Sequence, residues 1–353
     1  MKSKITGLII LIAVSAVVGE YFYVSSNRQE TKTLSGYLGG EKVGLIEDEE
    51  IEKYIEDTYH VKFDYSKAGS LEMITADQSG RDYLFPSSQV ALELYKSEYG
   101  SPKKSEIIFN TPIVFYTHRA VTDAFEKEGL IRDLGDGAKG VDMDRFTQMI
   151  VDGKKWQDIG LTQLYGAVSV STTDPEKSNS GNMFAGLLAD VMTGSVADRK
   201  NIGSVMPELQ TIFERSGYMV NSSGDLFSQF LRMGIGAMPI MAGYESQLLE
   251  FTVQNPDTWA KVKDDIDILY PVPTVWSSHP YIALTDDGAR GIDALLDDKV
   301  QDLAWTKHGF RTGVSGADAD TAAFDVNGLQ KVVGSVVQMP DSGTMQEIID
   351  HLS

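Results

Sequence analysis

The feature that most constrains this chain is a repeated order in which a β-rich run, a short turn and an amphipathic helix follow one another. The predicted strands cover residues 61–67, 82–86, 107–117, 166–171 and 237–242. The predicted helices cover residues 44–59, 90–100, 121–129 and 182–194, and Gly100 and Gly194 end two of them. Strands that alternate with helices of this length are joined by right-handed crossovers in mixed, mostly parallel sheets. The predicted fold class is therefore α/β.

The length and charge of the chain set further limits. Its 353 residues are enough for two domains with their own cores, and 42% hydrophobic residues exclude a wholly disordered chain. The 51 acidic residues outnumber the 31 Lys and Arg, which gives a formal net charge of −20. A surface this acidic repels phosphate backbones. We therefore expect no nucleic-acid partner.

The residue types that carry most enzyme chemistry are scarce here. The chain has no cysteine, which excludes disulfides, thiolate metal sites, cysteine nucleophiles and a lipid-modified N-terminal cysteine. No two of its five histidines have the spacing of a helical metal pair, and the sequence has neither a G-x-S-x-G elbow nor a Walker loop. His279 lies in a β-rich segment, where a structural role is expected. We predict no enzyme activity, no catalytic residue, no metal site and no cofactor.

The N-terminal segment, residues 1–30, indicates export. Lys2 and Lys4 precede an apolar run over residues 5–19, which is typical of a signal peptide. Apolar residues resume at 21–24, and about 20 residues in total are enough for an uncleaved membrane anchor. Both alternatives stay open. Either one predicts an extracytoplasmic protein, periplasmic or at the cell surface, that is secreted or anchored by this segment.

The strand-to-helix junctions are the places to look for a ligand, because open α/β sheets bind ligands where strands end and helices begin. The most informative junction spans residues 172–182 and opens the helix at 182–194. A helix N-terminus offers free N–H groups and a partial positive charge, which favour an anion. The alternative is plain capping of the helix, but three polar residues before a glycine exceed what one cap requires. The candidate ligand residues here are Thr173, Ser178, Asn179 and Ser180.

Three further junctions add candidates. Ser70 and Ser88 each follow a predicted strand, and for each the alternative is an ordinary N-cap. Tyr244 follows the apolar run at 237–242 and is a candidate lid over a ligand. Glu245 lies beside it, and a carboxylate that faced an anion would repel it unless turned aside or protonated. Glu245 therefore keeps a cationic or zwitterionic ligand open.

Several segments together resemble a known family. The signal segment, AGSLEM at 68–73, IIFNTPIVFYT at 107–117, TTDPEKSNSGNMFAG at 172–186 and QDLAWTKHGFRTG at 301–313 occur in the order typical of extracellular solute-binding proteins. More specifically, the chain resembles the two-lobed class, periplasmic binding protein type II, which includes the sulfate-, molybdate- and phosphate-binding components of ATP-driven importers. The resemblance covers residues 35–313. Lys177 stands where the phosphate-binding pattern has arginine, which weakens phosphate more than oxyanions in general.

The resemblance implies two Rossmann-like lobes joined by two crossover hinge strands, with the ligand held between them. Lobe one would comprise 35–110 plus 276–353, and lobe two 111–275. On matching positions, lobe-one contacts fall on Ser70 and Ser88, and lobe-two contacts fall on the 172–182 junction and Tyr244. The implied function is a monomeric receptor that captures a small polar solute, with an oxyanion favoured, and delivers it to a membrane permease. The alternative is an exported sensor or adhesion module on the same fold.

Overall fold

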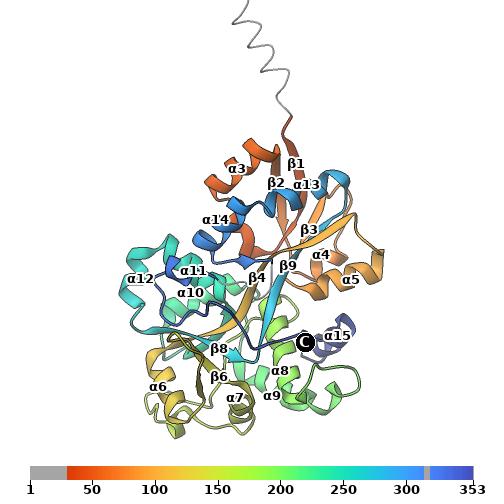
Figure 1. Ribbon diagram of the computed structural model, residues 1–353. Coiled ribbons are helices and arrows are strands. Elements are labelled where there is room, and N and C mark those ends of the chain that lie inside the picture. Colours follow the sequence, from red (N-terminus) through yellow and green to blue (C-terminus); the bar gives the residue numbers. More distant parts are fainter. Residues whose placement is uncertain (1–29, 314–318, 353) are drawn as a thin grey trace, which may run out of the picture.

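The computed structural model describes residues 30–313 and 319–352. The predicted signal or anchor segment at 1–30 lies almost wholly outside these residues. No helix within 30–313 or 319–352 is long and apolar enough to cross a membrane. The described chain folds into two lobes that share long strands at their junction (Figure 1).

Lobe one is the sheet with strand order β2-β1-β3-β9-β4 and the helices packed on it. Strands β1, β2 and β3 run parallel, whereas β9 is antiparallel to both β3 and β4. Its strands are β1 (Lys32–Leu38), β2 (Val61–Lys67), β3 (Tyr83–Phe85), β4 (Lys104–His118), β9 (Thr274–Ala283) and the short β10 (Arg311–Thr312). Its helices are η1 (Gly40–Lys42), α2 (Val43–Ile46), α3 (Glu49–Tyr59), α4 (Glu72–Thr75), α5 (Gln89–Tyr99), α13 (Asp286–Leu295) and α14 (Asp298–His308).

Lobe two is the sheet in which β4 lies between β7 and β8, followed by β6 and β5. Its other strands are β5 (Ile131–Asp133), β6 (Lys139–Asp142), β7 (Ile240–Tyr244) and β8 (Ile266–Val272). Its helices are α6 (Arg119–Lys127), α7 (Met143–Val151), η2 (Trp156–Ile159), α8 (Asn179–Thr193), η3 (Ile202–Ser204), α9 (Met206–Ser216), α10 (Ser223–Met233), α11 (Glu245–Gln254) and α12 (Pro256–Val262). Phe115, Phe146 and Phe184 form edge and tilted ring contacts in its core.

The long β-rich run predicted at 107–117 is the strand that joins the lobes. Residues 104–112 of β4 pair with β9 in lobe one, and residues 113–118 pair with β7 and β8 in lobe two. The side chains of β4 from Ile108 to His118 are buried, because sheets and helices of both lobes cover them. The chain thus has the predicted α/β fold with two lobes and crossover strands.

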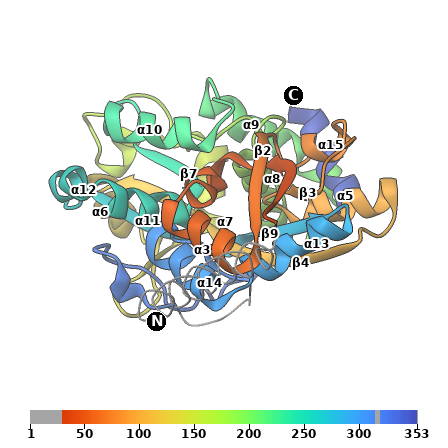
Figure 2. The same ribbon diagram turned by 90° about the horizontal axis from the view of Figure 1, so that it is seen from above.

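The C-terminal part differs from the expectation that all of 276–353 belongs to lobe one. Helix α15 (Ser342–Leu352) packs against α8 and α9 of lobe two as well as α5 of lobe one, and it lies beside α8 in Figures 1 and 2. Met345 and Ile348 are buried in the same cluster as residues of α8 and α9. The short strand β11 (Val336–Val337) pairs with β9, and η4 (Thr321–Ala323) precedes it. The other predicted lobe limits remain predictions.

The predicted helix ends are confirmed, whereas one predicted strand is wrong. Helix α5 ends at Gly100 and α8 ends at Gly194, both with positive φ, as predicted. The predicted strand at 166–171 is wrong, because this stretch forms only isolated bridges, such as Ser171 with Met241.

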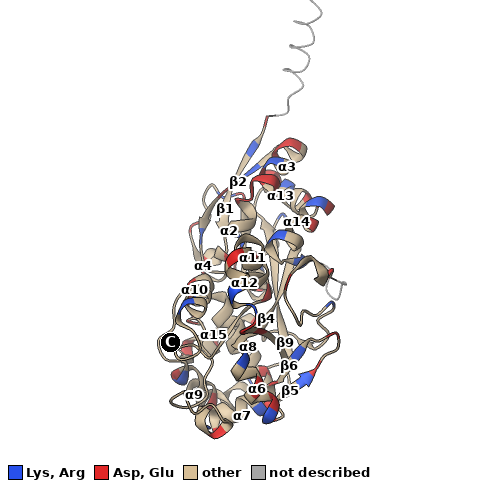
Figure 3. Ribbon diagram, turned by 90° about the vertical axis from the view of Figure 1, so that its left-hand side faces the viewer, with Lys and Arg blue, Asp and Glu red and all other residues tan. Residues whose placement is uncertain are grey.

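Acidic positions occur on outer helices of both lobes, including α3, α13 and α7 (Figure 3).

Candidate ligand-binding site

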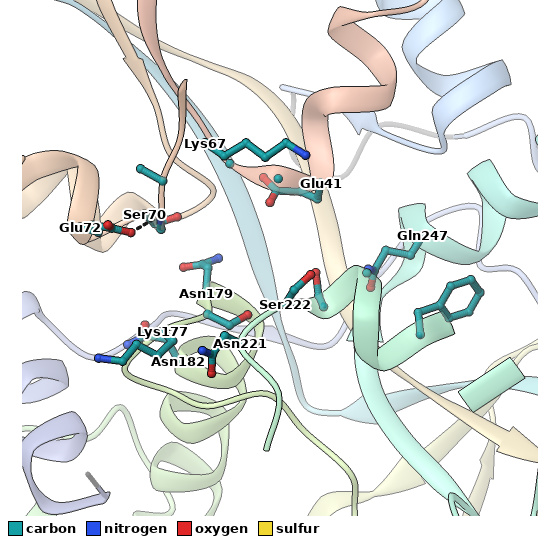
Figure 4. Close-up of a pocket in the computed structure, with 18 of the residues that line it drawn as sticks. Glu41, Lys67, Ser70, Glu72, Lys177, Asn179, Asn182, Asn221, Ser222 and Gln247 are labelled. Atoms are coloured by element: carbon teal, nitrogen blue, oxygen red, sulfur yellow. Dashed lines mark hydrogen bonds between the residues drawn. The ribbon is translucent and has the colours of Figure 1, made fainter. Parts of the chain in front are cut away.

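A cavity of about 1050 Å³ lies between the lobes. Lobe one supplies the turns after β1 and β2 and the start of α4, and lobe two supplies the starts of α8, α10 and α11. In Figure 4, lobe-one side chains lie along one side of the cavity and lobe-two side chains along the other. The polar lining includes Glu41, Lys67, Ser70, Glu72, Ser178, Asn179, Asn182, Asn221, Ser222 and Gln247. This is the place where an open α/β fold binds ligands.

The start of α8 forms the centre of the lobe-two wall. Ser178 is the N-cap residue, but its side chain accepts no hydrogen bond from the first turn, and its Oγ lies 3.2 Å from Ser180 Oγ. The capping alternative is therefore wrong for Ser178. Asn179 Nδ2 donates to the Ser87 carbonyl at 2.9 Å and to Tyr244 Oη at 3.0 Å. The first turn thus keeps N–H groups without a side-chain cap beside the cavity.

Two other residues of this junction lie beneath the cavity surface. Thr173 and Ser180 are buried, and their hydroxyl oxygens lie 2.7 Å apart. Neither lines the cavity. A Cβ at Gly181 would collide with the carbonyl oxygen of Thr173. The glycine is therefore explained by close packing of 173–174 on the helix, not by a ligand.

Of the two lobe-one candidates, Ser70 lines the cavity and Ser88 does not. Ser70 lines the cavity and does not cap α4, whose N-cap is Leu71; its Oγ accepts a hydrogen bond from the Ser87 backbone N–H at 2.9 Å. Ser88 is buried and caps α5 by accepting from Val90 N at 3.2 Å. The capping alternative is therefore confirmed for Ser88, which does not line the cavity.

The expectations for Tyr244 and Glu245 need correction. Tyr244 is buried beneath Asn179, so it is not an exposed lid. Glu245 is fully buried and does not line the cavity, because its carboxylate is held by Arg311 at 2.6 Å and 2.9 Å and accepts from Tyr270 at 2.5 Å. Glu245 is turned aside, so it neither repels an anion nor binds a cation in the cavity.

The sequence reasoning missed a buried charged network in the lobe-one wall. Lys42 is fully buried, and its ammonium donates to Glu41 Oε1, to Ser87 Oγ at 2.7 Å and to His279 Nδ1 at 3.2 Å. Ser87 Oγ in turn donates to Glu41 Oε1. Ser277 Oγ lies 3.3 Å from His279 Nε2 and donates to the Ser87 carbonyl at 2.6 Å. The three ammonium hydrogens of Lys42 are thus all used.

The protonation states of this network follow from its contacts. Burial opposes ionisation of Glu41, but the adjacent Lys42 ammonium and the hydrogen bonds from Lys42 and Ser87 outweigh it and lower the pKa of Glu41 to about 2. Burial, together with the charge of Lys42, lowers the pKa of His279 well below its ordinary value. His279 is therefore neutral and accepts from Lys42 through Nδ1. This supports the expected structural role of His279.

Other cavity residues were also missed. Asn182 is one turn into α8, Asn221 and Ser222 precede α10, and Gln247 lies in the first turn of α11. The only sequence signal for them is the polar stretch NSS at 221–223 before a helix, because Asn182 and Gln247 stand inside helices.

Some charged residues of the cavity wall have a hydrogen-bonded or ion-pair partner, whereas Glu72 and Lys67 form no ion pair among the described residues. Glu41 is paired with Lys42, and Glu176 lies 2.7 Å from Lys177. Glu250 Oε1 lies 2.7 Å from His308 Nδ1. The remaining lining is dominated by amide and hydroxyl groups. Such a wall offers directed hydrogen bonds, which suit a polar ligand.

Comparison with known proteins identifies the fold. No family model and no curated protein matches the sequence. The chain is similar to the periplasmic binding protein AfuA from Actinobacillus pleuropneumoniae with fructose-6-phosphate bound, at a TM-score of 0.60 and 13% identity over 90% of this chain and 97% of AfuA. It is also similar to iron-bound HitA from Pseudomonas aeruginosa, with a TM-score of 0.57 and 12% sequence identity. This match covers 91% of this chain and 99% of HitA. The match to the sulfate-binding protein SubI from Mycobacterium tuberculosis has a TM-score of 0.51 and 15% sequence identity. It covers 85% of this chain and 93% of SubI.

The chain has the fold of periplasmic solute-binding proteins, type II. The resemblance seen in the sequence is confirmed at the level of the fold. The three solved structures carry or are named for a sugar phosphate, iron and sulfate. One fold therefore serves chemically different ligands, and the ligand of this chain has to be argued from its own cavity.

Proposed function

We propose that this protein is an exported receptor that captures a small polar solute between its two lobes and delivers it to the membrane permease of an ATP-driven importer. The observation that carries the proposal is the cavity of about 1050 Å³, because both lobes line it with polar side chains and helix starts. A ligand in contact with both walls favours closure of the lobes about the shared strands. The fold neighbours support the same role.

The start of α8 supports an oxyanion group on the solute. Ser178 leaves the first turn without a side-chain cap, and Ser178 and Asn179 both line the cavity. Helix N-termini bind anions through free N–H groups and the partial positive charge of the helix. The negative charge of the solute lies at this wall in the proposal.

The extracytoplasmic location completes the proposal. The apolar run behind Lys2 and Lys4 supports export, either with a cleaved signal peptide or with a retained anchor. An extracytoplasmic receptor meets its solute outside the cell and its permease at the membrane surface.

The test is the melting temperature of the full chain with a panel of oxyanions, sugar phosphates, amino acids, polyamines and metal ions. A ligand at 100 times its Kd stabilises the protein by about 2.7 kcal/mol, a shift of several degrees. We expect an anionic class to give this shift. Ser178→Asp then abolishes it without lowering the melting temperature of the free protein, because aspartate is a good N-cap that repels an anion.

The control is Ser204→Asp, which adds the same charge at an exposed position of lobe two outside the cavity. It leaves the ligand shift unchanged. A shift with amines alone would contradict the anion assignment and favour a cationic solute. No shift with any compound would contradict solute capture and favour a sensor or adhesion module.

A further inference from the structure

We infer that Glu41 and Asn182 make this cavity selective for a hydroxylated organic anion, whose hydroxyl group donates a hydrogen bond to Glu41, over a fully ionised inorganic oxyanion. The inference rests on the proposed function and narrows its ligand. Glu41 follows β1 in lobe one, and Asn182 lies in α8 of lobe two. Both line the cavity and are labelled in Figure 4.

The Glu41 carboxylate is held in place with one oxygen left for a ligand. Its hydrogen bonds from Lys42 and Ser87 both go to Oε1, and no hydrogen bond within residues 30–313 and 319–352 goes to Oε2. The side chain is only 9% exposed, and that exposure is at the cavity. Glu41 therefore presents a fixed acceptor to the interior of the site.

Gly39 shows how closely the network is fitted around this carboxylate. A Cβ at this position would lie 2.5 Å from Glu41 Oε1 and 2.8 Å from Ser87 Oγ. The backbone φ of Gly39 is an ordinary −66°, so the glycine is required by the close approach and not by its conformation. The turn after β1 is built to admit the carboxylate.

Asn182 of lobe two is the second residue on which the inference rests. Its side chain is buried, and neither Oδ1 nor Nδ2 has a hydrogen-bond partner within the described part of the chain. A buried amide without partners costs free energy that native proteins avoid unless water or a ligand completes its bonds. The amide can both donate and accept, which suits a hydroxyl group.

The charges of this wall decide which donor group fits. Glu41 is ionised and can only accept hydrogen bonds, so a sulfate ion, which has no proton to donate, is repelled by Oε2. A ligand ammonium would approach the cavity residue Lys67, which forms no ion pair within the described residues. A neutral hydroxyl has neither disadvantage.

The size of the cavity agrees with an organic ligand. At about 1050 Å³ it is far larger than a tetrahedral inorganic anion and at the upper end of the range for small organic ligands. An anionic group at the start of α8 leaves room for a hydroxylated body that reaches Glu41 and Asn182.

The experiment measures Kd by calorimetry for the full chain and its Glu41→Gln variant. The probes are glucose 6-phosphate and gluconate as hydroxylated anions, and sulfate and molybdate as inorganic ones. We expect the wild-type protein to bind at least one hydroxylated anion at least tenfold more tightly than sulfate. Glu41→Gln then weakens that binding about tenfold and strengthens sulfate binding, because repulsion is lost and an amide donor is gained.

Two variants separate specificity from folding. Glu128→Gln changes a Glu–Lys pair of lobe two outside the cavity and leaves every Kd unchanged. If Glu41→Gln does not fold because Lys42 is left unpaired, the double variant Glu41→Gln/Lys42→Met removes both charges and is assayed instead. A merely structural role of Glu41 would weaken all probes alike and would not change their order.

The outcomes distinguish this inference from the proposed function. Sulfate or molybdate bound as tightly as the hydroxylated anions, or an unchanged order in Glu41→Gln, overturns the inference and leaves solute capture standing. Binding of none of the four probes overturns the inference. If, in addition, no compound of the panel shifts the melting temperature, solute capture itself is overturned.

Discussion

Glu41 of lobe one and Asp190 of lobe two are both buried carboxylates, and their protonation states differ. In lobe one, Glu41 has Lys42 beside it, and its pKa falls to about 2. In lobe two, Asp190 of α8 accepts one hydrogen bond, from Ala197 N at 2.7 Å, and its Oδ2 has no partner among the described residues. Burial raises the pKa of Asp190 to about 7. A buried counter-charge, and not burial itself, therefore decides whether a carboxylate is ionised.

The two cavity walls also differ in the groups that they present. The lobe-one wall presents a permanently ionised acceptor, Glu41, stiffened by a buried lysine. The lobe-two wall presents hydroxyls, amides and the start of α8, together with the ion pair of Glu176 and Lys177. The ligand proposed above presents a hydrogen-bond donor to the lobe-one wall and a negative group to the lobe-two wall.

The largest effect is expected for the substitution Lys42→Met. It leaves Glu41 buried without its counter-charge, so we expect the free energy of unfolding to fall by about 3 to 5 kcal/mol. Urea denaturation measures the change. The matched variant Lys154→Met removes a partly exposed partner of Glu128, 2.6 Å away, and costs less than about 1 kcal/mol. Equal losses in the two variants would show that burial of Lys42 confers no special role.

The second prediction concerns pH and Asp190. Its folded-state pKa, about 7, lies above the ordinary value of 3.8, so the native state binds the proton more tightly than the unfolded state does. Stability from this group is therefore full below about pH 4 and is lost as pH rises through 7. Asp190→Asn stays neutral at every pH. We expect its stability relative to the wild type to be greater at pH 8 than at pH 5 by on the order of 2 kcal/mol.

Thermal or urea unfolding at the two pH values checks this expectation. Glu41 supplies the contrast, because a group with a pKa of about 2 stays ionised from pH 5 to pH 8 and adds no slope in that range. An Asp190→Asn variant with the same pH dependence as the wild type would show that Asp190 is ionised throughout.

The third prediction concerns Asn179, which connects the two cavity walls by a hydrogen bond to Ser87. Asn179→Ala removes donors to the Ser87 carbonyl of lobe one and to Tyr244, and it removes a cavity amide. We expect about tenfold weaker binding of the anion that gives the largest melting shift, and a loss of about 1 kcal/mol in stability. Asn201→Ala, which changes an amide of lobe two outside the cavity, leaves the Kd unchanged. Equal Kd values in all three proteins would rule out a ligand contact at Asn179.

Much of the fold could be predicted from local patterns. The alternation of strands and helices, the long run that becomes β4 and the glycines that end α5 and α8 all depend on neighbouring residues. The strand predicted at 166–171 failed because its backbone meets β7 only through an isolated bridge. Tertiary pairing, which no local pattern contains, decided that case.

The site was less predictable for a physical reason. Ser70, Ser178 and Asn179 could be predicted to line the cavity because junctions between strands and helices are visible in the sequence. Glu41 and Lys42 look like an exposed turn, since neighbouring Glu and Lys are usually solvated. Their burial depends on Ser87 and His279, which are 45 and 237 residues from Lys42.

Glu245 shows the opposite error. A carboxylate beside a helix start looks like a ligand contact, yet Arg311, 66 residues further along the chain, turns it into a buried ion pair. The identity of a side chain was readable from the sequence, but its partner was not.

The most direct test of capture between the lobes is the distance between them with and without ligand. The chain has no cysteine, so Glu93→Cys on α5 and Asp225→Cys on α10 carry spin labels at two defined, exposed sites, one on each lobe. Pulsed electron paramagnetic resonance measures the distance in the presence of the anion that gives the largest melting shift. We expect a narrower distance distribution with a shorter mean when the ligand is saturating. An unchanged distribution at saturation would contradict capture by both lobes.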